Sequence, residues 1–394
     1  MDLYSLYLHV PFCRHRCSYC DFNTFAGQNR WIPLYVEALC REIQQVSSAA
    51  PERIPVHTVF FGGGTPSLLE VGHFSAILST LRQSFDFQPE VEVTIEANPG
   101  TVTARYLNEL RQVGVNRLSF GMQSAHPDDL RLLERQHDFF DVVQAVRWAR
   151  QAGFTNLSLD LIFGLPGQSL ERWRETLERA LGMQPEHLSL YALTIEHGTP
   201  LQRRWGRGMV PLVDDDLAAE MYEHAMDRLE TAGFTQYEIS NWARSENSTL
   251  YSCKHNLQYW HNQPYFGFGA GAHGFAGGAR TMNVGGIKPF INRCQVDGQA
   301  QFPAGPAARR TISIDRFTEM QETMMVGLRL TQDGVSSLSF QQRFHQSLED
   351  CFGEQIKNMQ KVGLLEWTDE MDPHLRLTRR GRLLGNQVFM QFVG

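Results

Sequence analysis

Short runs of β-branched and aromatic residues alternate with amphipathic helical stretches from residue 4 to about residue 195. The runs cover residues 5–10, 56–61, 91–97, 116–122, 156–163 and 187–193. Six βα units in series predict an α/β fold with a parallel sheet. Two arrangements accommodate six strands: an open doubly wound sheet, or a curved partial barrel that falls short of the eight-stranded closure.

Polar residues and glycines gather where the predicted strands end. HVPFC follows the first strand and GGGTP follows the second. Glu96 ends the third strand, Gln123 follows the fourth and Asp160 lies on the fifth. Because chemistry in such folds belongs at the carboxyl ends of the strands, we expect these residues to surround one site at a common rim.

The βα rhythm stops after about residue 213. Residues 214–230 have a helical pattern, 237–286 are rich in aromatic residues and glycine, and 298–310 have the composition of a linker. The rest predicts a winged-helix-like module, from helical patterns at 314–330 and 338–352, the run KVGLLEW, a turn at 369–373 and a last helical stretch. We therefore expect three segments, 1–213, 214–305 and 306–394.

Composition and charge narrow the class of protein. The chain is 42% hydrophobic and 20% charged, with a formal net charge of -7, which argues against a general nucleic-acid binder. No apolar run approaches the roughly 20 residues of a membrane span, and the N-terminus lacks the regions of a signal peptide. We expect a cytoplasmic protein without a membrane span and without a nucleic-acid partner.

The chain has seven cysteines, of which Cys13, Cys17 and Cys20 cluster. An odd count with one tight group fits a reduced compartment and a metal site better than a disulfide framework. The spacing CxxxCxxC lets a short loop wrap three thiolates around three corners of a 4Fe-4S cluster and leaves one iron open. Zinc or reduced structural thiols are the alternative, although zinc prefers four ligands and the sequence offers no second pair.

In this setting the chain resembles the radical-SAM superfamily, and within it the branch of the oxygen-independent coproporphyrinogen III oxidases. Tyr7 stands six residues before Cys13, Tyr19 precedes Cys20, and GGGTP occupies 62–66. The resemblance implies a partial (β/α)6 TIM-like barrel that binds S-adenosylmethionine (SAM).

The glycine run gives the resemblance a physical basis. Backbone N–H and C=O groups at Gly63, Gly64 and Thr65 can approach the amine and carboxylate of a methionine moiety closely. A glycine run that simply forms a turn is the alternative for this segment.

Four more polar residues match the branch: Glu96, Gln123, Arg135 and Asp160. The resemblance implies that they, with Tyr7 and Tyr19, bind SAM. It also implies reductive cleavage of SAM with electrons from a donor such as flavodoxin or ferredoxin, and we assign no catalytic side chain. The alternative for Glu96 and Asp160 is that these acids cap the helices that follow them.

Within the branch, the sequence departs from the oxidases toward the HemW proteins, which are haem chaperones. Phe22 stands where the oxidases have a fourth cysteine, and the chain begins directly at its first strand. The segment from His255 to Trp260 resembles the proposed haem-binding motif HNxxYW. In a helix His255 and Tyr259 share a face, so a histidine ligand and stacking aromatics, Trp260 among them, come together.

Alternatives remain open for this motif. The same residues could form a satisfied polar cap, and Cys253, His261 and His273 are other candidate ligands. The leading hypothesis is a haem chaperone that carries haem, or another tetrapyrrole, to acceptor haemoproteins. An oxygen-independent coproporphyrinogen III oxidase is the second hypothesis, and a DNA-binding regulator that uses the C-terminal module is a weak third.

Overall fold

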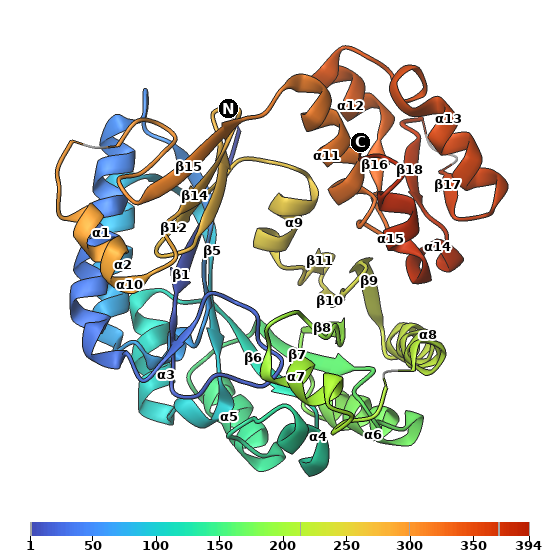
Figure 1. The fold of residues 1–394 in the computed structure, drawn as a ribbon, viewed down its shortest axis with the longest axis horizontal. Helices are drawn as coiled ribbons and strands as arrows, with labels where there is room; N and C mark the ends of the chain where they lie inside the picture. Colours follow the sequence, from blue (N-terminus) through green and yellow to red (C-terminus); the bar gives the residue numbers. More distant parts are fainter. Residues whose placement is uncertain (1, 213, 299, 369–370, 394) are drawn as a thin grey trace. The chain divides into compact units, whose positions relative to one another are not determined.

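Each predicted βα unit contributes one strand to a parallel sheet, drawn in Figure 1. The strands are β1 (Tyr4–Val10), β4 (Pro55–Gly63), β5 (Asp86–Ala97), β6 (Arg117–Gln123), β7 (Leu157–Phe163) and β8 (His187–Ala192). Neighbours in the chain are neighbours in the sheet, and all five pairs are parallel. A doubly wound sheet reverses its strand order at a switch point, whereas this order advances in one direction. The arrangement is that of the predicted partial barrel.

The computed structural model describes residues 2–212, 214–298, 300–368 and 371–393, which form two compact units. The first unit comprises residues 1–228 and 264–312, and the second comprises 229–263 and 313–394. The predicted middle segment 214–305 is thus divided between the units. The reason is that its second half adds strands to the sheet of the first unit.

Helices follow each of these strands along the chain. They are α1 (Ile32–Ala49), α2 (Val71–Ser84), α3 (Ala104–Val113), α4 (Pro127–Leu132), α5 (Phe139–Gln151), α6 (Leu170–Gly182), α7 (Pro200–Gly206) and α8 (Asp215–Thr231). Local chemistry fixes their ends: the Thr103 side chain caps α3, and Gly114 ends it with a φ of 109°, which suits glycine. On β7, Leu157, Leu159 and Leu161 are fully buried. Alternate residues of a strand point to opposite faces, so Ser158 and Asp160 face the other side of this strand.

A further group of strands extends the sheet beyond β1. β12 (Tyr265–Phe268) pairs with β1 in parallel, and β13 (His273–Ala276), β14 (Ala279–Asn283) and β15 (Ala308–Ser313) follow it in order. The helix α10 (Ile287–Cys294) lies between β14 and β15 in the chain. The sequence marked this region only as aromatic and glycine-rich, and β15 begins inside the predicted linker.

The second unit combines a small sheet with several helices. Its first part holds β9 (Phe234–Glu238), β10 (Asn241–Glu246), β11 (Thr249–Leu250) and α9 (Lys254–Trp260). Its second part holds α11 (Arg316–Gly327), β16 (Val335–Ser336), α12 (Ser337–Phe344), α13 (Leu348–Lys361), β17 (Leu365–Trp367), β18 (His374–Leu377), α14 (Arg379–Leu383) and α15 (Gly385–Phe389). The strands pair in the order β16-β18-β17. This is the predicted helix, helix, hairpin and helix.

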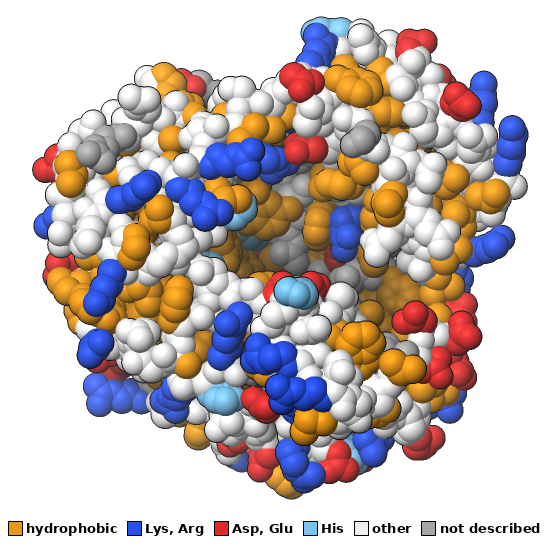
Figure 2. All heavy atoms as spheres, in the orientation of Figure 1, with side chains coloured by type: hydrophobic (Ala, Val, Ile, Leu, Met, Phe, Trp, Pro, Cys, Tyr) orange, Lys and Arg blue, Asp and Glu red, His pale blue; other side chains and the backbone are white. Residues whose placement is uncertain are grey.

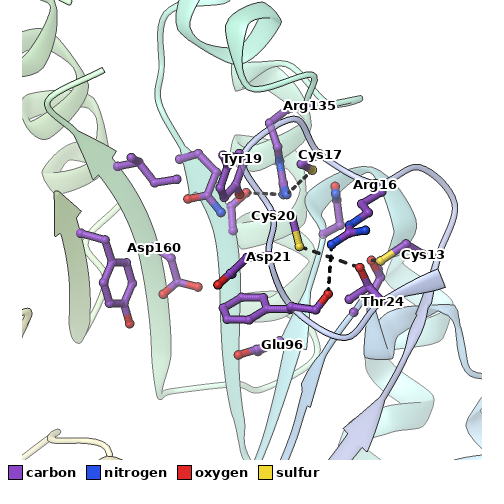
Figure 3. A pocket seen from close by; sticks show the side chains of 18 of the residues that line it. Cys13, Arg16, Cys17, Tyr19, Cys20, Asp21, Thr24, Glu96, Arg135 and Asp160 are labelled. Atoms are coloured by element: carbon purple, nitrogen blue, oxygen red, sulfur yellow. Dashed lines mark hydrogen bonds between the residues drawn. The ribbon is translucent and has the colours of Figure 1, made fainter. Parts of the chain in front are cut away.

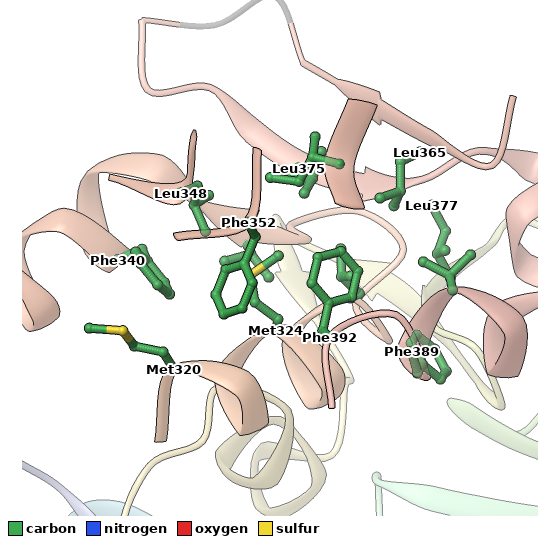
Figure 4. Packing of buried hydrophobic residues seen from close by; sticks show 14 of the residues in the cluster. Met320, Met324, Phe340, Leu348, Phe352, Leu365, Leu375, Leu377, Phe389 and Phe392 are labelled. Atoms are coloured by element: carbon green, nitrogen blue, oxygen red, sulfur yellow. The ribbon is translucent and has the colours of Figure 1, made fainter. Parts of the chain in front are cut away.

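The structure has two helices where the sequence predicted one in this unit. His345 adopts a left-handed φ of 51° and ends α12, so the expected helix 338–352 is broken before α13 begins. Of the predicted turn at 369–373, residues 369 and 370 lie outside the described chain. Figure 4 shows the core of this unit, where Phe340, Phe352 and Leu375 pack together with at most 2% of their surface exposed.

Charged side chains of both signs are scattered over the face of the molecule drawn in Figure 2. No helix within the described ranges is long and apolar enough to cross a lipid bilayer.

Candidate functional site

A cavity of about 470 Å³ opens in the first unit. It is lined by residues from the loop after β1 and from the carboxyl ends of β4 to β8, as the strand-end pattern predicts. The lining includes these predicted residues: Cys13, Cys17, Tyr19, Cys20, Gly63, Gly64, Thr65, Glu96, Gln123, Arg135 and Asp160. Figure 3 shows Cys13, Cys17 and Cys20 to one side, with Glu96 and Asp160 facing the same space. Its volume is in the range of small-molecule sites.

The loop that carries the three cysteines is closed on itself. Its two ends, β2 (Phe12–Cys13) and β3 (Phe25–Ala26), pair in parallel, and the N–H of Phe25 donates to the carbonyl of Pro11 at 2.7 Å. In the middle, the hydroxyl of Ser18 donates to the carbonyl of Leu132 at 2.9 Å. The loop is therefore fixed at both ends and at its centre.

Each thiol of the loop has a polar neighbour. The hydroxyl of Thr65 donates to Sγ of Cys13 at 3.6 Å, and Nη1 of Arg135 donates to Sγ of Cys17 at 3.5 Å. Sγ of Cys20 lies 3.9 Å from the hydroxyl of Thr24. Burial raises the pKa of the Cys13 thiol. A positive metal centre would reverse this shift, because coordination removes the proton of a thiol.

These donors fit an iron–sulfur cluster. Three thiols of one loop line the cavity, while Cys40, Cys253, Cys294 and Cys351 do not. Among the described side chains, no group of three or more His, Cys, Asp or Glu is close enough to hold one metal ion. The thiols therefore do not outline a single-ion site, whereas a cluster takes each thiolate at a separate corner.

The glycine run packs against the first strand and its loop. A Cβ atom at Gly63 would overlap the ring of His9, and one at Gly64 would lie 2.6 Å from the carbonyl oxygen of Phe12. The N–H groups are also in use: Gly63 donates to Glu96 at 3.2 Å, and Gly64 and Thr65 donate to Val10 and Phe12, both at 2.8 Å. The three N–H groups therefore have acceptors within the protein, and a role of this segment in ligand binding stays a prediction.

Two carboxylates lie at the cavity floor. Burial raises the pKa of Glu96 to about 7, the nearby charge of Asp160 adds to the rise, and the N–H of Gly63 opposes it. Both oxygens of Asp160 accept from the Ser119 hydroxyl, at 2.9 and 3.0 Å. Burial raises the pKa of Asp160 as well, against the effect of this hydroxyl.

The helix-cap alternative for these acids does not hold. The side chain of Asn98 caps the short turn after β5, Thr103 caps α3, and Ser169 caps α6, the helix after β7. Glu96 and Asp160 are therefore left to line the cavity. A cavity with two half-buried, neighbouring carboxylates is suited to a cationic ligand with hydroxyl groups.

Gln123 and Arg135 complete this wall. Gln123 adopts a φ of 63°, a left-handed conformation that is uncommon for a residue other than glycine and that occurs at functional sites. The second amino group of Arg135 donates to the carbonyl of Gly121 at 2.9 Å. Arg135 thus connects the end of β6 to Cys17, because its other amino group contacts the sulfur.

The two predicted tyrosines differ in position. Tyr19 lines the cavity and packs against Leu133, Ile162 and Leu165. Tyr7 is not among the lining residues, and its hydroxyl contacts Nδ1 of His9 at 3.0 Å. Burial, followed by the charge of Glu96, raises the pKa of Tyr7, so the phenol keeps its proton and donates a hydrogen bond to His9.

His9 and Asn23, which the sequence analysis did not single out, hold the cysteine loop in place through hydrogen bonds. Nε2 of His9 donates to the backbone carbonyl of Asn23 at 2.9 Å. The Asn23 amide donates to the carbonyls of Ala270 and Gly285, both at 2.9 Å. The position of Asn23, three residues after the last clustered cysteine, was the only signal available in the sequence.

The HNxxYW segment lies on α9, in the second unit, and is helical as expected. His255 is only 1% exposed, and its Nε2 lies 2.9 Å from the hydroxyl of Tyr259. The guanidinium of Arg329 lies 4.5 Å from the centre of the Trp260 ring. Of the alternative ligands, Cys253 is buried and His261 is exposed. The imidazole and the indole thus already have partners within the unit.

Comparison with known protein families identifies the superfamily and the C-terminal domain. Residues 7–180 match the Radical SAM superfamily, and residues 314–384 match the HemN C-terminal domain. Coproporphyrinogen III oxidase (HemN) from Escherichia coli has a similar fold, with a TM-score of 0.81 and 24% sequence identity over 99% of this chain and 90% of that chain.

Curated relatives then define the family. Heme chaperone HemW of Bacillus subtilis (strain 168) is 38% identical over 392 residues, which are 99% of both chains. Heme chaperone HemW of Mycobacterium tuberculosis (strain ATCC 25618 / H37Rv) is 36% identical over 399 residues, 99% of this chain and 95% of that protein. The chain belongs to the HemW family of the radical-SAM superfamily.

Proposed function

We propose that this protein binds haem and passes it to acceptor haemoproteins, and that it holds a 4Fe-4S cluster and SAM in the cavity of its first unit. The names of its relatives, which are heme chaperones, support haem as the cargo. The observation that carries the cavity assignment is that three cysteine thiols and two half-buried carboxylates line the same space.

Cys13, Cys17 and Cys20 would hold the cluster through their thiolates. When bound, the cluster supplies single electrons for the reductive cleavage of SAM, and a flavodoxin or a ferredoxin is the proposed donor. Arg135 donates a hydrogen bond to Sγ of Cys17 and so helps to orient this ligand. We place this chemistry in the cytoplasm, where thiols stay reduced.

The carboxylates would take the hydroxyl groups and the ammonium of SAM. Asp160 is oriented by the hydroxyl of Ser119, and Glu96 by the N–H of Gly63. Tyr19, Gln123, Arg135 and the 63–65 segment border the same space and complete the proposed SAM contacts. Tyr7 contributes indirectly, because its hydroxyl orients His9 and His9 in turn holds Asn23.

His255, Tyr259 and Trp260 are the proposed haem contacts of the second unit. Ligation of haem iron by Nε2 of His255 requires its hydrogen bond with Tyr259 to break, because the same nitrogen makes both interactions. Stacking of a porphyrin on Trp260 requires a ring face that Arg329 does not cover.

Anaerobic reconstitution tests the cavity assignment. The protein should gain about four irons and four sulfides, as one cubane cluster requires, and saturating SAM should change the EPR spectrum of the reduced cluster. Asp160→Asn should weaken the SAM effect and leave the iron content unchanged. A wild-type spectrum that does not respond to SAM would contradict the assignment.

A further inference from the structure

The mouth of the cavity in the first unit carries two large aromatic side chains that are exposed to solvent. Phe22 is 62% exposed and Tyr191 is 45% exposed, and both line the cavity. Phe22 belongs to the cysteine loop that follows β1, and Tyr191 lies on β8, so they come from the two ends of the six-strand run. Single exposed apolar residues are ordinary, but aromatic rings at the rim of a cavity are typical of a ligand site.

None of the cofactor contacts proposed above uses these rings. The thiols, Glu96 and Asp160 offer the polar groups that a cluster and SAM need. Phe22 and Tyr191 offer flat apolar faces instead, and Ile162 and Leu193 add aliphatic surface to the same lining. A ligand that uses this part of the cavity therefore has a broad apolar face.

A cation contacts the backbone of Phe22. Arg16 is exposed, lines the cavity and donates from its guanidinium to the backbone carbonyl of Phe22 at 3.4 Å. Figure 3 shows Arg16 near the part of the loop that carries Cys20 and Thr24. A guanidinium has five donors, so this one contact leaves it able to bind a carboxylate. The combination of aromatic faces and a cation fits a planar ring that bears carboxylate side chains.

We infer that the cavity mouth is a docking site for a tetrapyrrole, in which Phe22 and Tyr191 contact the ring and Arg16 binds one of its carboxylates. The inference rests on the proposed function, in which a tetrapyrrole is the cargo. It places a cargo contact in the first unit, apart from the HNxxYW segment. There, His255 is buried and Arg329 lies over the Trp260 ring, so those two rings are less accessible than the rings at the mouth.

Metal-free protoporphyrin IX is the sharpest probe, because it has the ring and the carboxylates of haem but takes no axial ligand. Its fluorescence is titrated with the reconstituted full-length protein. Phe22→Ala and Tyr191→Ala should each weaken binding about tenfold, as expected for aromatic contacts at the centre of an interface. Phe140→Ala is the matched control, since Phe140 is 77% exposed on α5 and does not line the cavity.

Arg16→Gln should also weaken porphyrin binding, and Arg14→Gln, at an exposed position outside the lining, should not. A second readout is the release of SAM. A ring docked over the mouth should slow the dissociation of SAM from the wild-type protein, and Phe22→Ala should remove this effect. Each variant is first matched to wild type in iron content and in its EPR response to SAM.

The outcomes are distinct. Equal porphyrin affinity of Phe22→Ala, Tyr191→Ala and Phe140→Ala would overturn the inference. Loss of binding in His255→Ala alone would also overturn it and would place the cargo on the HNxxYW segment. A wild-type protein that binds neither haem nor protoporphyrin would overturn the proposed function itself.

Discussion

Replacement of Glu96 by Gln should make the protein more stable and at the same time a poorer SAM binder. Burial raises the pKa of Glu96 to about 7 in the folded chain, against an ordinary value of about 4.3 for an unfolded glutamate. Between these values the folded state binds the proton more tightly, so the stability of the SAM-free protein falls as pH rises through this window and stays low above it. Glu96→Gln removes the charge and therefore removes this loss of stability.

The size of the effect follows from the shift. One pKa unit corresponds to about 1.4 kcal/mol, so the rise of the pKa of Glu96 from about 4.3 to about 7 makes the ionised carboxylate cost between about 3 and 4 kcal/mol above pH 7. That cost is an upper bound for the gain of Glu96→Gln at pH 8. At pH 5 the native side chain is protonated and resembles Gln, so the difference in unfolding free energy should shrink.

The affinity for SAM should rise with pH, whereas the stability of the SAM-free protein falls. If the ammonium of SAM needs ionised Glu96, a group with a pKa of about 7 makes the affinity about tenfold lower at pH 6 than at pH 8. Glu96→Gln should bind weakly at both pH values and should lack this dependence. The comparison of the two proteins cancels the titration of SAM itself.

Thermal unfolding of the SAM-free protein and anaerobic calorimetric titration of SAM, each at pH 6 and pH 8, measure the two effects. A Glu96→Gln variant that is less stable than wild type at pH 8, or that keeps the wild-type pH dependence of SAM affinity, would refute the reasoning.

Three other changes have clear expected outcomes. Cys17→Ala should abolish the cluster while Cys40→Ala keeps about four irons per chain, which iron analysis checks; a Cys17→Ala protein with full iron would contradict the ligand assignment. Gly63→Ala should lower the unfolding temperature, because the new methyl group meets the His9 ring and the φ of 106° is unfavourable; an unchanged melting curve would count against it. Tyr259→Phe should strengthen haem binding several-fold by removing one hydrogen bond that competes for Nε2 of His255; unchanged haem titrations would contradict a role of this hydrogen bond in haem binding.

The sequence predicted the part of the fold that repeats. Runs such as 156–163 combine β-branched or large apolar residues with a turn on each side, which is a strong local signal. β12 was missed because YFGF is only four residues long, and its parallel partner β1 lies far away in the chain. The break between α12 and α13 was missed because His345, and not the usual glycine, adopts the left-handed conformation that ends α12.

The site was predictable in its residue types but not in its internal bonds. The cysteine spacing and the strand-end positions predicted that Cys13, Glu96 and Asp160 lie around one site, and all three line one cavity. That Gly63 donates to Glu96, and that Tyr7 points to His9 rather than into the cavity, depends on the packing of strands that are far apart in sequence. Hydrogen-bond partners of this kind leave no periodic pattern in a sequence.

The most direct test of the proposed function follows the fate of the tetrapyrrole. The reconstituted protein, with SAM and a reductant, is given haem and an apo-haemoprotein in one experiment and coproporphyrinogen III in another. The account predicts that haem binds, that the absorption spectrum of the acceptor appears as haem is transferred, and that coproporphyrinogen III is recovered unchanged. Conversion of coproporphyrinogen III to protoporphyrinogen IX, with no haem delivered to the acceptor, would contradict it and identify an oxidase.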